Sequence, residues 1–255
     1  MVNKIVLWFF ALGILWAVPG TVAGQEGGSG EDWAFDTAIY LWGASIGGES
    51  ATGDNIDIDF NDLLDNMEFA FMTTIGAHRD KWSLIADFIY LDVKDDEQGS
   101  LTVPVGPSSF VVGTDSEVEL SGWIVTPLVS YNVLQTERIT INALAGARYL
   151  WLEADVEVKV GPSKVKFSDS GHVWDGIVGV RGQVNLSDKW YLPYHLDMGA
   201  GDTDFTWQVL CGIGYRLEKF DVNMGYRYLD WDFDDNDVFD DMNKKGLYGG
   251  AIFRF

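Results

Sequence analysis

The chain ends with Leu247-Tyr248-Gly249-Gly250-Ala251-Ile252-Phe253-Arg254-Phe255, in which alternate positions are apolar or glycine up to the last residue. A soluble domain usually leaves a frayed polar segment at such a place. A transmembrane β-strand instead needs an apolar lipid face and backbone pairing along its length. The stretch therefore predicts the closing strand of an outer-membrane β-barrel. Phe253 and Phe255 are the expected signal to the barrel-assembly machinery.

The first 24 residues have the layout of a cleaved secretory signal. Lys4 precedes the apolar run 5–18, and Pro19-Gly20 leads to small residues around Gly24. An apolar run of about 14 residues is shorter than the roughly 20 that a spanning helix needs. We expect cleavage after Gly24, with Ala23 as the alternative, a flexible segment at 25–32 and a barrel over 33–255.

Composition limits the classes of function. The chain has 39 acidic and 17 basic residues, a net charge of −22, which excludes a general nucleic-acid binder because such a protein needs a basic face. Cys211 is the only cysteine, so an intrachain disulfide is excluded. The mature part contains no run of 18 consecutive apolar residues and suits one all-β domain. No cofactor is expected.

Alternation of apolar and polar residues predicts about ten antiparallel transmembrane strands, with eight as the alternative if segments near 190–200 and 220–230 are mis-phased. Segment 117–133 is apolar on both faces, so the sequence does not show which face is turned to the lumen and which to the lipid. An even strand count places both termini on one side, the periplasmic one, and the long loops outside. Tight turns are predicted at 79–81, 134–137, 186–189 and 217–219, and long loops at 44–66, 94–116, between Trp151 and Trp174, and at 230–244.

A soluble β-sandwich would also have alternating strands. In a sandwich the polar face meets water and carries many charges. Here the polar face is sparse and rich in Gly, Ala, Thr and single charges, as in a narrow lumen. The opposite face carries Trp and Tyr near the strand ends, as an aromatic girdle requires. The pattern favours an up-and-down transmembrane barrel.

Several segments resemble a family of Gram-negative outer-membrane β-barrel proteins that are described as porin-like. The resemblance covers nearly the whole mature chain and implies location and fold, but no catalytic residues. The segments that carry it are Tyr40-Leu41-Trp42, Phe60-Asn61-Asp62-Leu63-Leu64-Asp65-Asn66, Ala145-Gly146-Ala147-Arg148-Tyr149, Asp204-Phe205-Thr206-Trp207-Gln208 and Gly225-Tyr226-Arg227-Tyr228-Leu229-Asp230.

Charged residues at the inward positions form the first candidate site. A charge that faces lipid near the midplane costs about 2–4 kcal/mol, so these residues are expected in the lumen. They either pair across the lumen and close it, or form a charged constriction that selects small solutes, and pairing is the favoured reading. The predicted lumen charges are Arg148, Arg181, Arg216, Arg227, Arg254, Asp36, Glu68, Asp87, Asp175, Asp197 and Asp221.

His195 and Asp197 share one face of a strand, since positions i and i+2 point the same way. They are expected towards the long-loop end, near Asp92. A base oriented by a carboxylate can activate water. Ten-stranded omptin proteases use Asp and His at a barrel rim, but with the order Asp-x-His. We therefore do not expect an enzyme, and surface hydrolysis is the weaker alternative.

Acidic loops form the third candidate. Asp232, Asp234, Asp235 and Asp237 could hold Ca²⁺ or Mg²⁺ between the protein and lipopolysaccharide, although the spacing lacks the glycine and glutamate of an EF-hand. A solvated, self-repelling loop is the alternative. The sequence as a whole predicts a porin-like or structural envelope barrel with a narrow charged lumen. Lipid and lipopolysaccharide are its expected partners.

Overall fold

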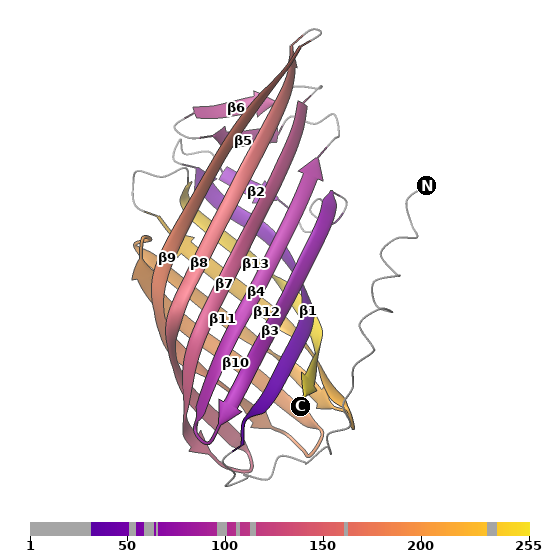
Figure 1. Cartoon of the computed structure of the whole chain (residues 1–255), viewed down its shortest axis with the longest axis vertical. Coiled ribbons are helices and arrows are strands. Elements are labelled where there is room, and N and C mark those ends of the chain that lie inside the picture. Colours follow the sequence, from indigo (N-terminus) through magenta and orange to yellow (C-terminus); the bar gives the residue numbers. More distant parts are fainter. Residues whose placement is uncertain are drawn as a thin grey trace.

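Ten long strands form one antiparallel sheet that closes on itself (Figure 1). The computed structural model describes residues 32–50, 55–58, 64, 66–95, 101–105, 108–112, 116–160, 163–233 and 239–255. The barrel strands are β1 (Ala34–Ser50), β3 (Met67–Arg79), β4 (Trp82–Asp95), β7 (Ser116–Gln135), β8 (Ile139–Val160), β9 (Ser163–Asn185), β10 (Trp190–Gly201), β11 (Phe205–Arg216), β12 (Phe220–Asp232) and β13 (Phe239–Arg254).

Closure joins the first and last strands. Asp36 pairs with Arg254 in the β1–β13 ladder, and the backbones of Phe35 and Phe255 exchange hydrogen bonds of 2.8 and 3.2 Å. β10, β11 and β12 each pair on both sides. The ten-strand prediction is therefore confirmed and the eight-strand alternative is wrong.

The two ends of the barrel differ in their connections. β1 begins and β13 ends at the same end as the tight connections 80–81, 136–138, 186–189 and 217–219. In the first of these turns Asp80 adopts a φ of 53°, a conformation that aspartate tolerates better than most residues. We call this the turn end and the opposite one the loop end.

Strand residues continue well into the segments predicted as loops. β1 runs on to Ser50 and pairs with the short β2 (Asn55–Ile58), and β13 already begins at Phe239. Segment 94–116 contains the hairpin of β5 (Leu101–Val105) and β6 (Ser108–Val112). The sequence predicts loops in these segments because the lipid-facing pattern stops there. Backbone pairing continues without it, since ladder hydrogen bonds do not depend on an apolar face.

The largest such extension is the β8–β9 hairpin, which stands above the rest of the loop end in Figure 1. The predicted loop between Trp151 and Trp174 is almost entirely strand, paired from Trp151↔His172 to Val160↔Ser163. β7 and β4 accompany it in steps, with Ser116 paired to Val158 and Asp95 to Val118. We call this four-stranded extension the projecting ribbon.

The outer surface of the barrel is apolar, and side chains alternate between it and the lumen. β7, whose sides the sequence left open, shows the same alternation. Val129 and Val133 are exposed outward, whereas Ile124, Thr126 and Leu128 are buried inward. β7 is apolar on both faces because its inner face also contributes to a packed interior.

Two belts of aromatic pairs mark the lipid boundary. At the turn end, Trp82–Tyr131 and Trp190–Tyr215 have ring centroids 4.8 Å apart. Towards the loop end lie Tyr90–Trp123 at 4.5 Å, Tyr149–Trp174 at 4.6 Å and Trp207–Tyr228 at 4.8 Å. The belts are about eight residues apart along β4, β7 and β11, or ~26 Å of strand. With the usual tilt this spans about 20 Å, close to the apolar band of an outer-membrane barrel.

Met224 lies midway between the belts on β12 and is 63% exposed. Met224→Arg is expected to lower the free energy of unfolding in lipid vesicles by about 2–4 kcal/mol, because the charge faces the bilayer midplane. Guanidinium titration followed by tryptophan fluorescence measures the change, with Met224→Leu as the control of similar volume. Equal stability of the two variants would contradict a lipid-facing surface.

Within the described residues, no helix is long and apolar enough to cross a membrane. The predicted secretory signal at 1–24 lies outside the described residues, as does most of the segment 25–32.

Candidate functional site

The loop-end half of the lumen is filled mainly by apolar side chains, which we call the apolar plug, and the buried Lys244 lies between the plug residues Ile46 and Leu229 in the sheet. Leu229 and Trp231 have no exposed surface, and Ile124 and Leu150 are nearly as deeply buried. The sequence predicts charges along the lumen but not this apolar core. Its members are Trp42, Ile46, Met72, Ile89, Val93, Ile124, Leu150, Leu229, Trp231, Met242 and Tyr248.

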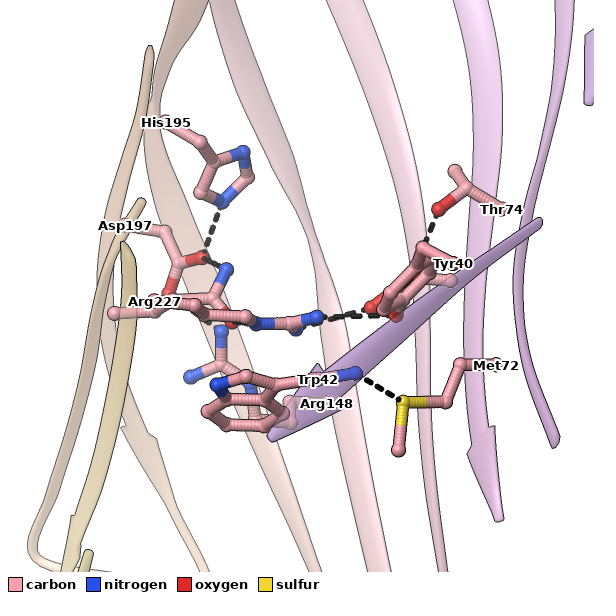
Figure 2. Close-up of polar contacts among 10 residues, drawn as sticks. Tyr40, Trp42, Met72, Thr74, Arg148, His195, Asp197 and Arg227 are labelled. Carbon is pink, nitrogen blue, oxygen red and sulfur yellow. Dashed lines mark hydrogen bonds and ion pairs between the residues drawn. The ribbon is translucent and has the colours of Figure 1, made fainter. Parts of the chain in front are cut away.

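Next to the plug, towards the turn end, a layer of charged and polar side chains crosses the lumen (Figure 2). Arg227 of β12 donates to Asp87 of β4 at 3.0 Å and to the Gln208 Oε1 atom at 2.6 and 2.9 Å. Asp87 also accepts from the hydroxyls of Tyr40 at 2.7 Å and Thr74 at 2.8 Å. Because β4 and β12 lie on nearly opposite sides of the closed sheet, this ion pair bridges the lumen.

A second ion pair continues the layer. Arg148 donates to Asp197 at 2.7 Å, and both side chains have no exposed surface. Asp197 also accepts from Gln208 at 3.1 Å, which joins the two ion pairs into one network. Arg148 additionally donates to the Thr206 hydroxyl at 2.9 Å. We call the whole network, from Asp87 to Arg148, the charged layer.

The plug and the charged layer are in direct contact. The Arg227 guanidinium carbon lies 4.8 Å from the Trp42 ring centroid, and that of Arg148 lies 6.0 Å from the ring of Trp231. Cations attract aromatic faces at such distances, most strongly where water is excluded. In addition, the Trp42 backbone N–H donates to the Met72 sulfur at 3.1 Å. Together the two layers occupy the lumen from its middle to the loop end.

His195 and Asp197 lie together but not where the sequence placed them. His195 Nε2 is 2.6 Å from Asp197 Oδ2, and in Figure 2 His195 and Trp42 lie on opposite sides of the charged layer. Asp92 accepts from Tyr90 at 3.2 Å on the outer surface of β4. The predicted grouping with Asp92 is wrong, because odd and even positions of β4 face opposite sides of the sheet.

The other predicted arginines lie towards the turn end. Arg254 forms two bonds of 2.7 and 2.6 Å with the buried carboxylate of Asp221. Arg216 donates to Asn185 at 2.7 Å, and its guanidinium carbon is 4.7 Å from the Tyr191 ring centroid. Arg181 is half-buried, and its guanidinium has no hydrogen bond or ion pair to any described residue. It interacts electrostatically with Asp36 and Asp87.

Two predicted lumen acids have other surroundings. Asp175 is buried at the loop end and accepts from the Thr203 backbone N–H at 3.0 Å and hydroxyl at 2.8 Å, so it holds the short β10–β11 connection. Glu68 is exposed beside a register shift between Met67 and Phe69, where the extra residue breaks the alternation of faces. The prediction of Glu68 as a paired lumen charge is therefore wrong.

The turn end also holds a hydrogen-bonded chain of side chains that the sequence did not predict. The Ser83 hydroxyl is 2.8 Å from His78 Nδ1, and His78 Nε2 is 2.8 Å from Asp36 Oδ2. The signal was present, because His78 and Ser83 face each other across the predicted turn at 79–81. Asp36 comes from β1, which precedes that hairpin and pairs with β3.

The remaining predicted groups lie apart from this site. Asp232 is exposed at the end of β12, while Asp234, Asp235 and Asp237 lie outside the described residues. The described part of the chain contains no group of three or more His, Cys, Asp or Glu side chains that could hold a metal ion. At the other end, Phe255 is 78% exposed, and the Phe253 ring lies 5.6 Å from that of Phe220.

Comparison with known proteins gives fold likeness only. No protein-family model and no curated protein matches the chain. Among solved structures, Ail of Yersinia pestis covers 88% of this chain and 98% of its own at 13% identity, with a TM-score of 0.39. The outer membrane protease OmpT of Escherichia coli covers 88% and 96% at 9% identity, with a TM-score of 0.47. Neisserial surface protein A covers 88% and 100% at 16% identity, with a TM-score of 0.34.

Proposed function

We propose that this barrel is a non-conducting structural component of the outer membrane that carries the projecting ribbon on the cell surface. In this proposal the turn end faces the periplasm and the loop end faces outward. The observation that carries it is the filled lumen. A porin needs a continuous aqueous path, whereas here the apolar plug lies directly on a charged layer that bridges the lumen.

The energetics of the charged layer support a permanent seal. One fully buried and one largely buried ion pair share Gln208 as a common partner. Opening a path would separate buried charges from their partners, and leaving one such charge uncompensated costs about 3–5 kcal/mol. Opening a path would also expose the apolar side chains of the plug to water, which is unfavourable. The charges therefore act as closure and not as a selective constriction.

The projecting ribbon supports a role at the surface. β8 continues about eleven residues past the belt residue Tyr149, or roughly 36 Å of strand. On its lipid-side face, Asp155 forms an ion pair with Lys166 of β9 at 3.0 Å. The hydrogen bond from Ser168, and then the contact with Lys166, hold the pKa of Asp155 below its ordinary value. The carboxylate therefore stays ionised at neutral pH.

Planar-bilayer recording of the refolded mature chain tests the proposal. We expect no steady single-channel conductance from protein whose heat-modifiable migration shows that it is folded. A known porin, refolded and added to the bilayer by the same procedure, serves as the positive control for insertion. A steady conductance that changes when Arg148 or Arg181 is neutralised would overturn the proposal in favour of a charged pore.

A further inference from the structure

Three side chains at the turn end of the lumen form a continuous hydrogen-bonded relay. Asp36 of β1, His78 of β3 and Ser83 of β4 are connected by two contacts of 2.8 Å, each to a different ring nitrogen of His78. When Nε2–H donates to the Asp36 carboxylate, Nδ1 carries the lone pair that accepts the Ser83 hydroxyl proton. A hydroxyl, an imidazole and a carboxylate in this order are the parts of an activated nucleophile.

The backbone next to the relay leaves room for it. Gly76 is the β3 residue paired with Asp36, and it lies two positions before His78. A Cβ atom at Gly76 would clash with the Asp36 carboxylate and come within 2.7 Å of His78 Nε2. The contact between Asp36 and His78 therefore requires glycine at this position. The opposing arginine, Arg254, is bound through both terminal nitrogens to Asp221 and leaves Asp36 to His78.

The relay is accessible from one side only. The side chains of His78 and Asp36 retain 35% and 31% of their accessible surface. A pocket of about 320 Å³ lies at the same end of the barrel, lined by the β7–β8 turn and by residues of β8 and β9 such as Thr140, Gln183 and Asn185, and not by the relay itself. The charged layer and the apolar plug occupy the route from the loop end. A substrate would therefore enter through the turn end.

We propose that Ser83, His78 and Asp36 form a serine hydrolase site that cleaves small carboxylic esters carrying an anionic group. Ser83 is the nucleophile, His78 is the general base and acid, and Asp36 is a positioning residue. The inference does not depend on the structural role proposed above, because a sealed barrel can still hold a site that opens to the turn end.

The reaction balances with water as the only co-reactant. Ser83 Oγ attacks the carbonyl carbon of the ester while its proton passes to His78 Nδ1. The bond to the alcohol oxygen breaks, and that oxygen takes the proton from Nδ1, leaving an acyl group on Ser83. A water molecule then transfers a proton to Nδ1 and attacks the acyl carbon. Ser83 Oγ departs with that proton, and the carboxylic acid is released.

Arg181 provides the reason for an anionic substrate. Its guanidinium faces the turn-end half of the lumen, interacts electrostatically with Asp36, and has no hydrogen bond or ion pair within the described chain. A half-buried arginine without a bonded carboxylate can bind a carboxylate or phosphate group through two parallel hydrogen bonds. Arg181 thereby favours esters with a second, negatively charged end.

Labelling with a fluorophosphonate probe tests the nucleophile. We expect the folded wild-type barrel to be labelled covalently at Ser83, as mass spectrometry of the peptide would show. Ser83→Ala should abolish labelling, and His78→Ala should lower the maximal labelling rate at least ~100-fold, since a positioned general base contributes about that much. Asp36→Asn should lower the maximal rate but leave the half-saturating probe concentration unchanged, unlike a merely structural defect.

Ser130 supplies the matched control, because it pairs directly with Ser83 on the neighbouring strand β7 and faces the same lumen. Ser130→Ala should be labelled like the wild type, and each variant must first show heat-modifiable migration. Absence of labelling in the folded wild type, or equal labelling of Ser83→Ala, would overturn the proposal. Conductance plays no part in this readout, so its failure and that of the sealed barrel are distinguishable.

The substrate class has a test of its own. The folded barrel should hydrolyse the anionic mono-p-nitrophenyl succinate more efficiently than the neutral p-nitrophenyl acetate. Arg181→Gln should raise KM at least ~10-fold for the anionic ester and leave the neutral one unaffected, because one charge-assisted contact is lost. An equal effect on both esters would overturn the anionic preference.

Discussion

Arg227→Met is expected to lower the free energy of unfolding by about 3–5 kcal/mol, because it leaves Asp87 as a buried carboxylate without its cation. Asp87 would keep only the hydroxyls of Tyr40 and Thr74. Gln208 would lose its donor as well. Guanidinium titration of the refolded barrel in lipid vesicles, followed by tryptophan fluorescence, measures the loss.

Two further variants show whether pairing is the cause. Adding Asp87→Leu to Arg227→Met should recover more than half of the lost stability, since removing both buried charges is far less costly than removing one. Arg216→Met, which replaces a partly exposed arginine at the turn end, should cost about 1 kcal/mol or less. If Arg227→Met were as mild as Arg216→Met, the charged layer would not be a stabilising part of the barrel.

The double variant Trp42→Ala/Trp231→Ala is expected to open the lumen and produce a steady conductance in planar bilayers. The two indoles cover the guanidinium groups of Arg227 and Arg148, and they fill the centre of the apolar plug. Trp231 has no exposed surface, so its truncation alone should cost about 3–5 kcal/mol in stability. Water can enter the space that remains and hydrate the guanidinium groups of Arg227 and Arg148, so that their ion pairs separate at little cost and the charged layer no longer closes the lumen.

Trp174→Ala is the matched control for this experiment. Trp174 lies on the lipid surface, is 49% exposed and contacts Tyr149 outside the lumen. Its loss should leave the barrel silent. If the Trp42/Trp231 variant folded and remained silent too, the charged layer alone would seal the lumen, and the plug would not be required for closure.

The lipid-facing half of the fold was predictable because lipid imposes a strict pattern on it. Alternation along Trp82, Leu84, Ala86, Phe88 and Tyr90 could be read directly, as could the even strand count. The parts of the strands beyond the aromatic belts were not predictable. A strand surrounded by water needs no apolar face, so its sequence lacks the alternating pattern. The register shift at Glu68 shows the same limit. An extra residue in the strand changes the side of the sheet to which a side chain points, and nothing in the neighbouring sequence indicates this.

The candidate sites were less predictable because they depend on contacts between distant strands. The sequence predicts both Arg227 and Asp87 in the lumen. It does not show that they bond to each other. The plug left a readable sign, since Leu229 and Trp231 follow Arg227 at alternate positions and therefore also face inward. The relay left one as well, in the pairing of His78 with Ser83 around a tight turn, but its third member comes from another hairpin.

The bond between Tyr40 and Arg227 joins residues 187 positions apart, and the ion pair of Asp87 with Arg227 joins residues 140 apart. Neither contact can form until β12, near the end of the chain, has been inserted together with the first strands. A partly assembled sheet therefore holds Asp87 without its cation, and the final registration of the last strands with the first removes that penalty. Contacts of such long range slow folding. Packing of the lumen and closure of the barrel thus become a single late step. A chain that has not completed this step still holds Asp87 without the Arg227 cation.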